Sequence, residues 1–129
     1  MKKFLSFIFA AVFINSSFSQ GNEPCTATPL TPGATCSFTT YSLAGMTPSA
    51  GPPAPGCASF GPSPDAWFSI VVPASGIVIL DGNNTGSITD GGMAAYSGAS
   101  CSALTLISCN DDGSANGLMP YLNLTGLNC

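Results

Sequence analysis

The sequence predicts an all-β domain, specifically an antiparallel β-sandwich of the jelly-roll kind that is held together by disulfides. No window of the chain shows a sustained apolar period of 3.6 residues, and 15 glycines and 11 prolines interrupt every candidate helix. Short runs of β-branched and aromatic residues recur instead at a spacing of about ten residues, separated by turn-forming clusters. The six cysteines are an even number, as expected of a disulfide framework in an exported chain.

Residues 1–19 have the layout of a secretory signal peptide. A positively charged start precedes an almost unbroken apolar run over residues 4–14, and Ser17 and Ser19 supply the small residues that signal peptidase reads. The apolar run is too short to cross ~30 Å of hydrocarbon, which needs about 20 residues. We therefore expect residues 20–129 to be secreted as a single β-sandwich domain that is not attached to a membrane.

The charges of the chain exclude several classes of function. The only cations are Lys2 and Lys3, and the chain has no histidine. Nucleic-acid binders and phosphate-binding enzymes need Lys or Arg, so the exported part fits neither class. Ser-His-Asp catalysis, Cys-His catalysis and His-ligated zinc are excluded as well. A glycosidase with two acids remains conceivable, but a single small β-domain offers little room for a deep cleft, so we predict that the chain is not an enzyme.

The first predicted strands lie before residue 81. Residues 36–43 are rich in Thr and aromatics and favour a strand, whereas residues 44–64 hold six Pro and four Gly and favour a long irregular loop. Residues 65–72 form the clearest strand, because apolar side chains alternate along it. A turn at 73–76 then predicts that the strand at 77–80 returns beside it as a hairpin.

The second half alternates short strands with polar loops. We expect strands at 93–97, 104–109 and 118–124, the last with Pro120 near its start, where a missing N–H is tolerable. Between them lie a polar turn cluster at 81–86, a turn at 97–100 and an acidic, glycine-containing loop at 110–117.

Several segments, taken in order, resemble a known family. They are NEPCTATPL (22–30), PAPGC (53–57), DAWFSIVVPASG (65–76), TDGGMAAYSGASCSALTLISCNDDG (89–113) and LNLTGL (122–127). Together they resemble secreted β-sandwich modules of Bacteroidetes exoproteins, which are akin to bacterial pre-peptidase C-terminal domains. The resemblance implies a non-catalytic module of a larger secreted protein, such as a protease or adhesin, that binds polymers or aids secretion.

In that family the chain continues past the Gly-Leu segment into one or two further strands. The resemblance therefore implies that this sequence is a fragment that lacks its last one or two strands, which would leave a sheet edge open. A local variation that ends the domain at Cys129 is the alternative.

Six cysteines allow 15 pairings, and the sequence alone does not choose among them. We expect Cys101–Cys109, because the chain between them turns back and both flank the family-like stretch. Cys36–Cys57 would tie a strand to the proline-rich loop. Cys25–Cys129 then follows by elimination, unless Cys25 pairs with a cysteine of a missing segment.

Calcium is the sharpest chemical hypothesis for the acidic loop. Starting at Asp112, the pattern Asp-x-Ser-x-Asn-Gly places oxygen donors at the first, third and fifth positions of a calcium loop. The five expected ligands are Asp90, Asp111, Asp112, Ser114 and Asn116; Asp81, Asn83 and Asn84 are alternative contributors. Asn123 at the twelfth position excludes a true EF-hand. The competing interpretation is that Asp, Asn and Gly simply form turns.

Aromatic residues suggest a second kind of site. Trp67, together with Tyr41, Tyr96 and Tyr121, would form a platform on which a sugar stacks. The alternative is that Trp67 belongs to the sandwich core, as is common for tryptophan.

These observations favour a non-catalytic extracellular module with an adhesive or polymer-binding role. Its expected partners are an extracellular polymer or glycan, or neighbouring domains of a larger secreted protein. The alternative is an accessory or propeptide-like segment of a larger secreted hydrolase such as a protease.

Overall fold

The computed structural model describes residues 21–58, 63–84 and 86–128, so the predicted signal peptide and Cys129 lie outside the described part. Six strands pair into three two-stranded sheets. They are β1 (Thr28–Leu30) parallel to β2 (Phe68–Ile70), β3 (Val78–Asp81) antiparallel to β6 (Tyr121–Leu124), and β4 (Met93–Ser100) antiparallel to β5 (Ala103–Asn110). Within the described residues the only helical element is the 3₁₀ turn η1 (Pro24–Thr26). The predicted all-β class is confirmed.

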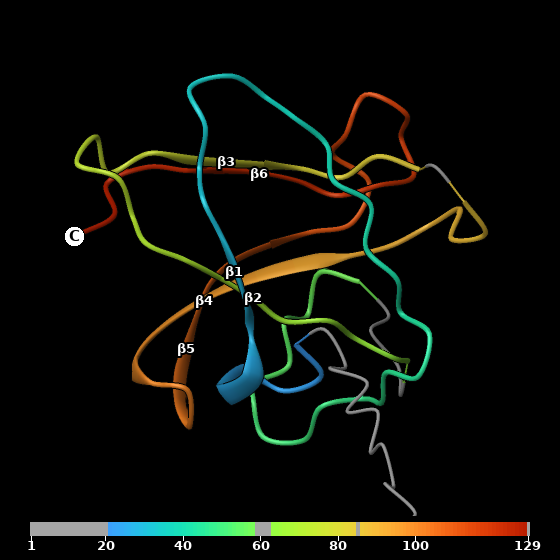
Figure 1. Cartoon of the computed structure of the whole chain (residues 1–129), viewed down its shortest axis with the longest axis horizontal. Coiled ribbons are helices and arrows are strands. Elements are labelled where there is room, and N and C mark those ends of the chain that lie inside the picture. Colours follow the sequence, from blue (N-terminus) through green and yellow to red (C-terminus); the bar gives the residue numbers. More distant parts are fainter. Residues whose placement is uncertain (1–20, 59–62, 85, 129) are drawn as a thin grey trace, which may run out of the picture.

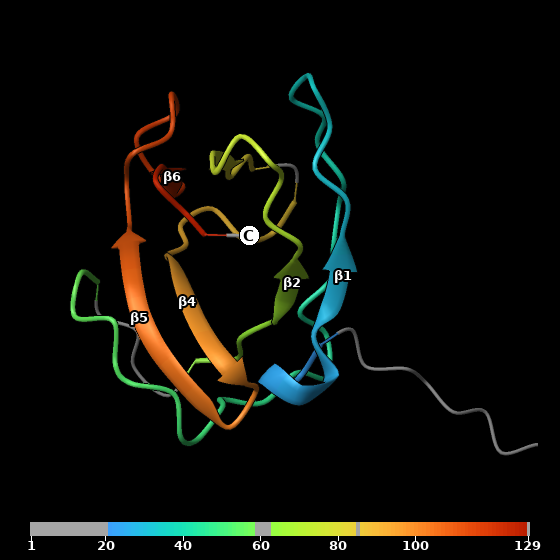
Figure 2. The same ribbon diagram turned by 90° about the vertical axis from the view of Figure 1, so that its left-hand side faces the viewer.

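The three sheets surround one small core (Figure 1 and Figure 2). Figure 2 shows the β4–β5 ribbon opposite β1 and β2, and Figure 1 shows β3 and β6 running together across the molecule. The core centre consists of Val78, Leu122 and Leu124. Half-buried apolar side chains from β2, β3, β4 and the C-terminal segment pack against it: Ile70, Leu80, Met93, Ala95 and Leu127. Every sheet therefore contributes to the core.

The β3–β6 sheet follows the expected alternation of strand side chains. Val78 is buried, whereas Ile77 and Ile79 are exposed. In β6, Leu122 and Leu124 are buried and Asn123 is exposed. Burying an aliphatic side chain of this size stabilises the fold by roughly 1.5–3 kcal/mol, so these three positions supply much of the apolar stabilisation.

The predicted hairpin between residues 65–72 and 77–80 is wrong. Its turn does form, because Gly76 has a φ of 65° and donates its N–H to Pro73 O at 2.8 Å. Beyond the turn, however, Gly76 O accepts the N–H of Leu127 at 3.1 Å, which aligns the following residues with the C-terminal segment. As a result β3 pairs with β6, and β2 pairs with β1.

The strand predicted at residues 36–43 is absent, and the one at 65–72 is reduced to Phe68–Ile70. Most of residues 36–43 is exposed, and Phe38 is 56% exposed. A run of β-forming residues makes no strand without a partner ladder and a sheet face to cover. Tyr41 is the main anchor of this segment, since its ring lies 4.6 Å from that of Phe68.

The β4–β5 hairpin is longer than predicted. The expected turn at 97–100 belongs to β4, and the chain reverses at 101–102 instead. A Cβ at Gly98 would collide with Ala103 O, so a glycine at this position lets the irregular end of β4 stay paired. In β5 the predicted alternation is confirmed, because Leu104 and Leu106 are half-buried.

All three expected disulfides are wrong. The structure contains Cys25–Cys101 and Cys57–Cys109, with Cα–Cα distances of 5.0 and 6.0 Å. Cys101 and Cys109 lie before and near the end of one extended strand, where eight residues span on the order of 25 Å. A disulfide requires Cα atoms within about 7 Å, so the two cannot pair. Cys36 is exposed and free, which removes Cys36–Cys57, and Cys25–Cys129 is excluded because Cys25 bonds Cys101.

The two disulfides span sequence separations of 76 and 52 residues. Cys25–Cys101 ties η1 to the β4–β5 turn, and Cys57–Cys109 ties the proline-rich segment to β5. Losing a native disulfide from a small secreted domain typically costs about 2–5 kcal/mol. With so few fully buried side chains in the described part, these cross-links are a major source of stability.

Candidate functional site

Three carboxylates converge where the β4–β5 hairpin opens. Asp90 lies before β4, and Asp111 and Asp112 follow β5. Because Met93 pairs with Asn110 in the antiparallel ladder, the two loops meet at this end of the hairpin. One carboxylate oxygen from each aspartate lies within 4.8 Å of those of the other two. The predicted ligands Asp90, Asp111 and Asp112 are therefore brought together.

The cluster has a distinctive electrostatic environment. Partial burial, followed by the negative charges of Asp112 and Asp90, raises the pKa of the Asp111 carboxyl above its ordinary value. The sequence contains no Lys, Arg or His after Lys3, so no side-chain cation of the described chain compensates these charges. A bound cation would relieve the repulsion.

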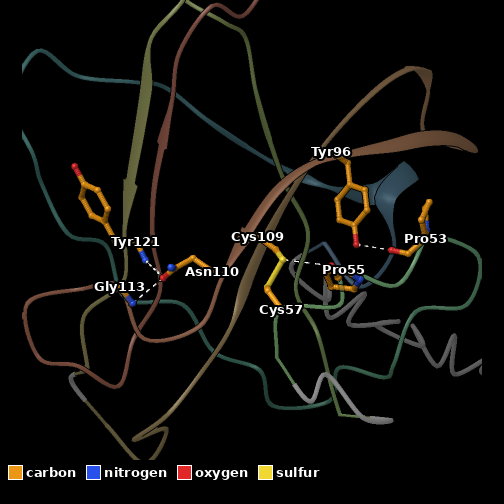
Figure 3. The surroundings of a disulfide bond; sticks show 8 residues. All are labelled: Pro53, Pro55, Cys57, Tyr96, Cys109, Asn110, Gly113 and Tyr121. Atoms are coloured by element: carbon orange, nitrogen blue, oxygen red, sulfur yellow. Dashed lines mark hydrogen bonds between the residues drawn. A yellow bond between two sulfur atoms is a disulfide. The ribbon is translucent and has the colours of Figure 1, made fainter.

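Hydrogen bonds from backbone N–H groups hold the two loops in place, and Figure 3 shows those that end on Asn110. The Asn110 side chain, at the end of β5, accepts hydrogen bonds through Oδ1 from the N–H groups of Gly113 at 2.7 Å and Tyr121 at 2.9 Å. On the other loop, Gly91 donates its N–H to Leu118 O at 3.2 Å. None of these bonds uses an aspartate, so the three carboxylates are positioned by their neighbours.

The two other predicted ligands, Ser114 and Asn116, are engaged with each other. Asn116 Oδ1 accepts hydrogen bonds from Ser114 Oγ at 2.7 Å and from the N–H groups of Leu118 and Met119, both at 3.0 Å. Ser114 is buried. These bonds close the turn after Asp112, as Asn does in many turns. Asn116 would have to give up these bonds before its Oδ1 could coordinate an ion, whereas the Ser114 hydroxyl, as a donor, keeps its oxygen lone pairs.

The donor set of the aspartate cluster fits a hard divalent cation. Calcium takes six to eight oxygen ligands, commonly carboxylates, carbonyls and waters, and tolerates irregular geometry. Asp90, Asp111 and Asp112 supply three carboxylates on adjacent loops. Asp90 and Asp112 are exposed, so solvent would complete the coordination shell.

The predicted aromatic platform is only partly assembled. The rings of Trp67 and Tyr96 lie 5.4 Å apart with an interplanar angle of 41°. Tyr121 lies on the other side of the Cys57–Cys109 disulfide from Tyr96 (Figure 3). The ring of Tyr41 lies against Phe68 instead. The structure therefore groups two of the four residues, Trp67 and Tyr96.

Trp67 and Tyr96 also anchor the proline-rich segment. The indole Nε1–H of Trp67 donates to Ser49 Oγ at 2.8 Å, and Tyr96 Oη donates to Pro53 O at 2.7 Å. The Asp65 carboxylate accepts two hydrogen bonds from Ser49, one from the Ser49 N–H at 3.1 Å and one from the Ser49 hydroxyl at 2.9 Å. Burial, followed by the charge of Asp65, raises the pKa of the Tyr96 hydroxyl. Sequence reasoning did not find Ser49, whose partners lie 16 and 18 residues away.

The Cys57–Cys109 disulfide adds a second anchor for the same segment (Figure 3). Cys109 Sγ lies 3.3 Å from Pro55 O. A disulfide sulfur carries no hydrogen, so this contact is one of close packing. The described part of the proline-rich segment is thus fixed to β4, to β5 and to the residues just before β2.

In the part of the chain that the structure describes, no helix has the length and apolar character needed to cross a membrane. Comparisons of the whole chain with protein-family models, with curated proteins and with solved structures gave no match.

Proposed function

We propose that this chain is a non-catalytic extracellular β-module whose acidic loops bind calcium and whose surface attaches to a polymer or glycan. The observation that carries the proposal is the convergence of Asp90, Asp111 and Asp112 within 4.8 Å in a chain that has no cation after Lys3. Three carboxylates repel one another at neutral pH, and a divalent ion turns that repulsion into attraction.

Calcium at this position would have a structural effect on the domain. The cluster joins the loop before β4 to the loop after β5, and the second loop leads directly to β6 of the core sheet. An ion held by both loops would fix the open end of the β4–β5 hairpin relative to β6. Stabilisation by a ligand that binds only the folded state grows with its concentration, reaching about 2.7 kcal/mol at 100 times the Kd.

Secretion and attachment are the other parts of the proposal. Two disulfides of long span are typical of domains that fold in an oxidising compartment. A surface with acids, amides and aromatics but no cations suits neutral polymers better than anionic ones. The absence of histidine removes the usual general base of serine and cysteine nucleophiles, which favours a role in attachment over catalysis.

Thermal melting tests the calcium part. We expect the purified, disulfide-intact domain to melt at a temperature several degrees higher in millimolar CaCl₂ than in EGTA, since about 1 kcal/mol shifts the Tm of a domain near this size by roughly 4 °C or more. Glu23→Gln removes a carboxylate outside the cluster and should retain the calcium response. An equal Tm of the wild-type domain in both buffers would remove calcium from the proposal.

A further inference from the structure

A surface hollow that is lined in part by the 110–117 loop contains polar groups other than the three aspartates of the cluster. It measures about 430 Å³ and lies between the end of β3 and the turn after Asp112. Its lining consists of Phe38, Asp81, Gly82, Asn83, Ser114, Ala115 and Asn116. The segment that carries Phe38 and the turn that carries Asn116 thus meet over the end of a core strand.

Asp81, which lines this hollow, has a carboxylate oxygen without a hydrogen-bond partner. This atom, Oδ1, is buried. A buried carboxylate oxygen without a donor costs free energy, and native proteins rarely retain one without a reason. Because Oδ1 itself has almost no contact with solvent, a ligand in the hollow reaches it only after the Asp81 side chain rotates, while the Asp81 backbone stays paired with Tyr121.

The hollow also offers groups that remain available for a ligand. Asn83 is exposed, and the three hydrogen bonds that hold the Asn116 turn all end on Oδ1, which leaves its Nδ2 group out of them. Phe38 is 56% exposed beside these amides. Gly82, which also lines the hollow, packs closely on Pro120, because a Cβ there would come within 2.9 Å of the proline ring.

We propose that this hollow binds one hexose unit of a neutral saccharide. Sugar hydroxyls donate to Asp81 and exchange hydrogen bonds with the side chains of Asn83 and Asn116, while the C–H face of the sugar packs on the Phe38 ring. The inference rests on the polymer-binding part of the proposed function and assigns it a place. It locates the sugar site away from the Trp67–Tyr96 pair, whose polar groups are engaged in the fold.

The composition of the hollow argues against charged ligands. An anionic sugar would meet the Asp81 carboxylate without any cation to bind it. A metal ion would find a single carboxylate here, whereas calcium sites in proteins usually combine several. A neutral polyhydroxylated ligand supplies the donors that Asp81 lacks and also fits the exposed aromatic ring.

A glycan array tests the proposal with the disulfide-intact domain in calcium. The array should carry neutral glucans, mannans and galactans beside sialylated and sulfated glycans, and the strongest neutral oligosaccharide is then titrated by calorimetry. We expect a neutral glycan to bind, and Asn83→Ala and Phe38→Ala each to weaken binding about tenfold, which corresponds to one lost hydrogen bond or ring contact. Asn123→Ala and Val71→Ala alter exposed residues outside the hollow and should leave affinity unchanged.

The outcomes distinguish glycan binding by the domain as a whole from the assignment of the hollow as the sugar site. Binding of a neutral glycan that neither Asn83→Ala nor Phe38→Ala weakens overturns the hollow as its site, while polymer binding stands. Selective binding of acidic glycans also overturns the hollow. If no glycan binds the wild-type domain, the polymer-binding function fails and the hollow assignment fails with it. Circular dichroism of each variant confirms that the fold is retained.

Discussion

Ser49 is one of the residues that join the proline-rich segment to the rest of the fold. Its hydroxyl serves Asp65 and Trp67 at once, and its N–H also reaches Asp65. A small residue in an irregular segment therefore supplies hydrogen-bond partners to the side chains of both Asp65 and Trp67. The indole that appeared suited to a ligand platform is committed to this contact.

Replacing Ser49 tests that role. Ser49→Ala leaves the part-buried Trp67 Nε1–H without its acceptor and removes one donor from Asp65, so we expect a loss of about 1–3 kcal/mol in the free energy of unfolding. Urea denaturation followed by Trp67 fluorescence measures it. Ser87→Ala, at an exposed position, is the matched control and should be near neutral. An equal effect of the two substitutions would contradict the account.

Asp111 provides a prediction about pH. Because its pKa is raised in the folded protein from an ordinary value of 3.8, the folded state holds this proton more tightly than the unfolded chain. The resulting stability is fully present below the ordinary pKa and is lost as the pH rises through the raised value. Asn does not ionise, so in EGTA the Asp111→Asn variant should not lose this stability as the pH rises.

Melting curves of wild type and Asp111→Asn in EGTA, recorded from about pH 3 to pH 7, measure the effect. The Tm of the variant minus that of the wild type should become more positive as the pH rises across this window. A difference that stays constant with pH would show that neither burial nor the charges of Asp112 and Asp90 raise the pKa of Asp111.

At the scale of elements, the cysteine pairings organise the fold. Endoproteinase Asp-N cleaves before aspartates, including Asp65, Asp90 and Asp111, and trypsin is of no use because no Lys or Arg follows Lys3. Cys25 and Cys57 lie in the fragment that ends at residue 64, and both of their partners lie in fragment 90–110. We expect mass spectrometry of the non-reduced digest to find these two fragments linked, and reduction to separate them.

The competing pairings predict a different digest. Cys36–Cys57 and Cys101–Cys109 would each close within one fragment, so the two fragments would separate without reduction. That result would contradict the observed arrangement of strands, because η1 and the proline-rich segment would lose their attachment to β5 and its turn.

Elements whose signal is local could be predicted from the sequence. The strand at 104–109, with its alternating Leu and Thr, and the turn at 73–76 were both located correctly. Pairing depends on contacts between distant residues, so the hairpin of 65–72 with 77–80 was wrong. The strand predicted at 36–43 failed for the same reason, because no neighbouring strand pairs with it.

In the candidate site, too, local features could be predicted from the sequence and contacts between distant residues could not. The acidic loop was recognised from Asp, Asn and Gly, yet the spacing pattern pointed to Ser114 and Asn116, which bond each other. What brings Asp90 to Asp111 is the register of the β4–β5 ladder, which a sequence does not reveal. The hollow at Asp81 depends on three segments that are far apart in the chain and was not foreseen as a binding site.

At the scale of the whole molecule, a small apolar core, two long-range disulfides and an uncompensated negative charge act together. Few described side chains are fully buried, so stability depends on the cross-links and on relieving repulsion in the acidic loops. Calcium would provide that relief in an extracellular medium, where millimolar concentrations match weak sites of this kind. This picture of stability therefore depends on whether the three aspartates bind calcium.

The most direct test is the effect of Asp111→Asn on the Tm at neutral pH in two buffers, one containing EGTA and the other about 10 mM CaCl₂. In EGTA the substitution removes a repelled charge and should raise the Tm. In calcium it removes a ligand and should lower the Tm, so the sign of the effect reverses between buffers. A change of the same sign in both buffers would contradict calcium binding at Asp90, Asp111 and Asp112.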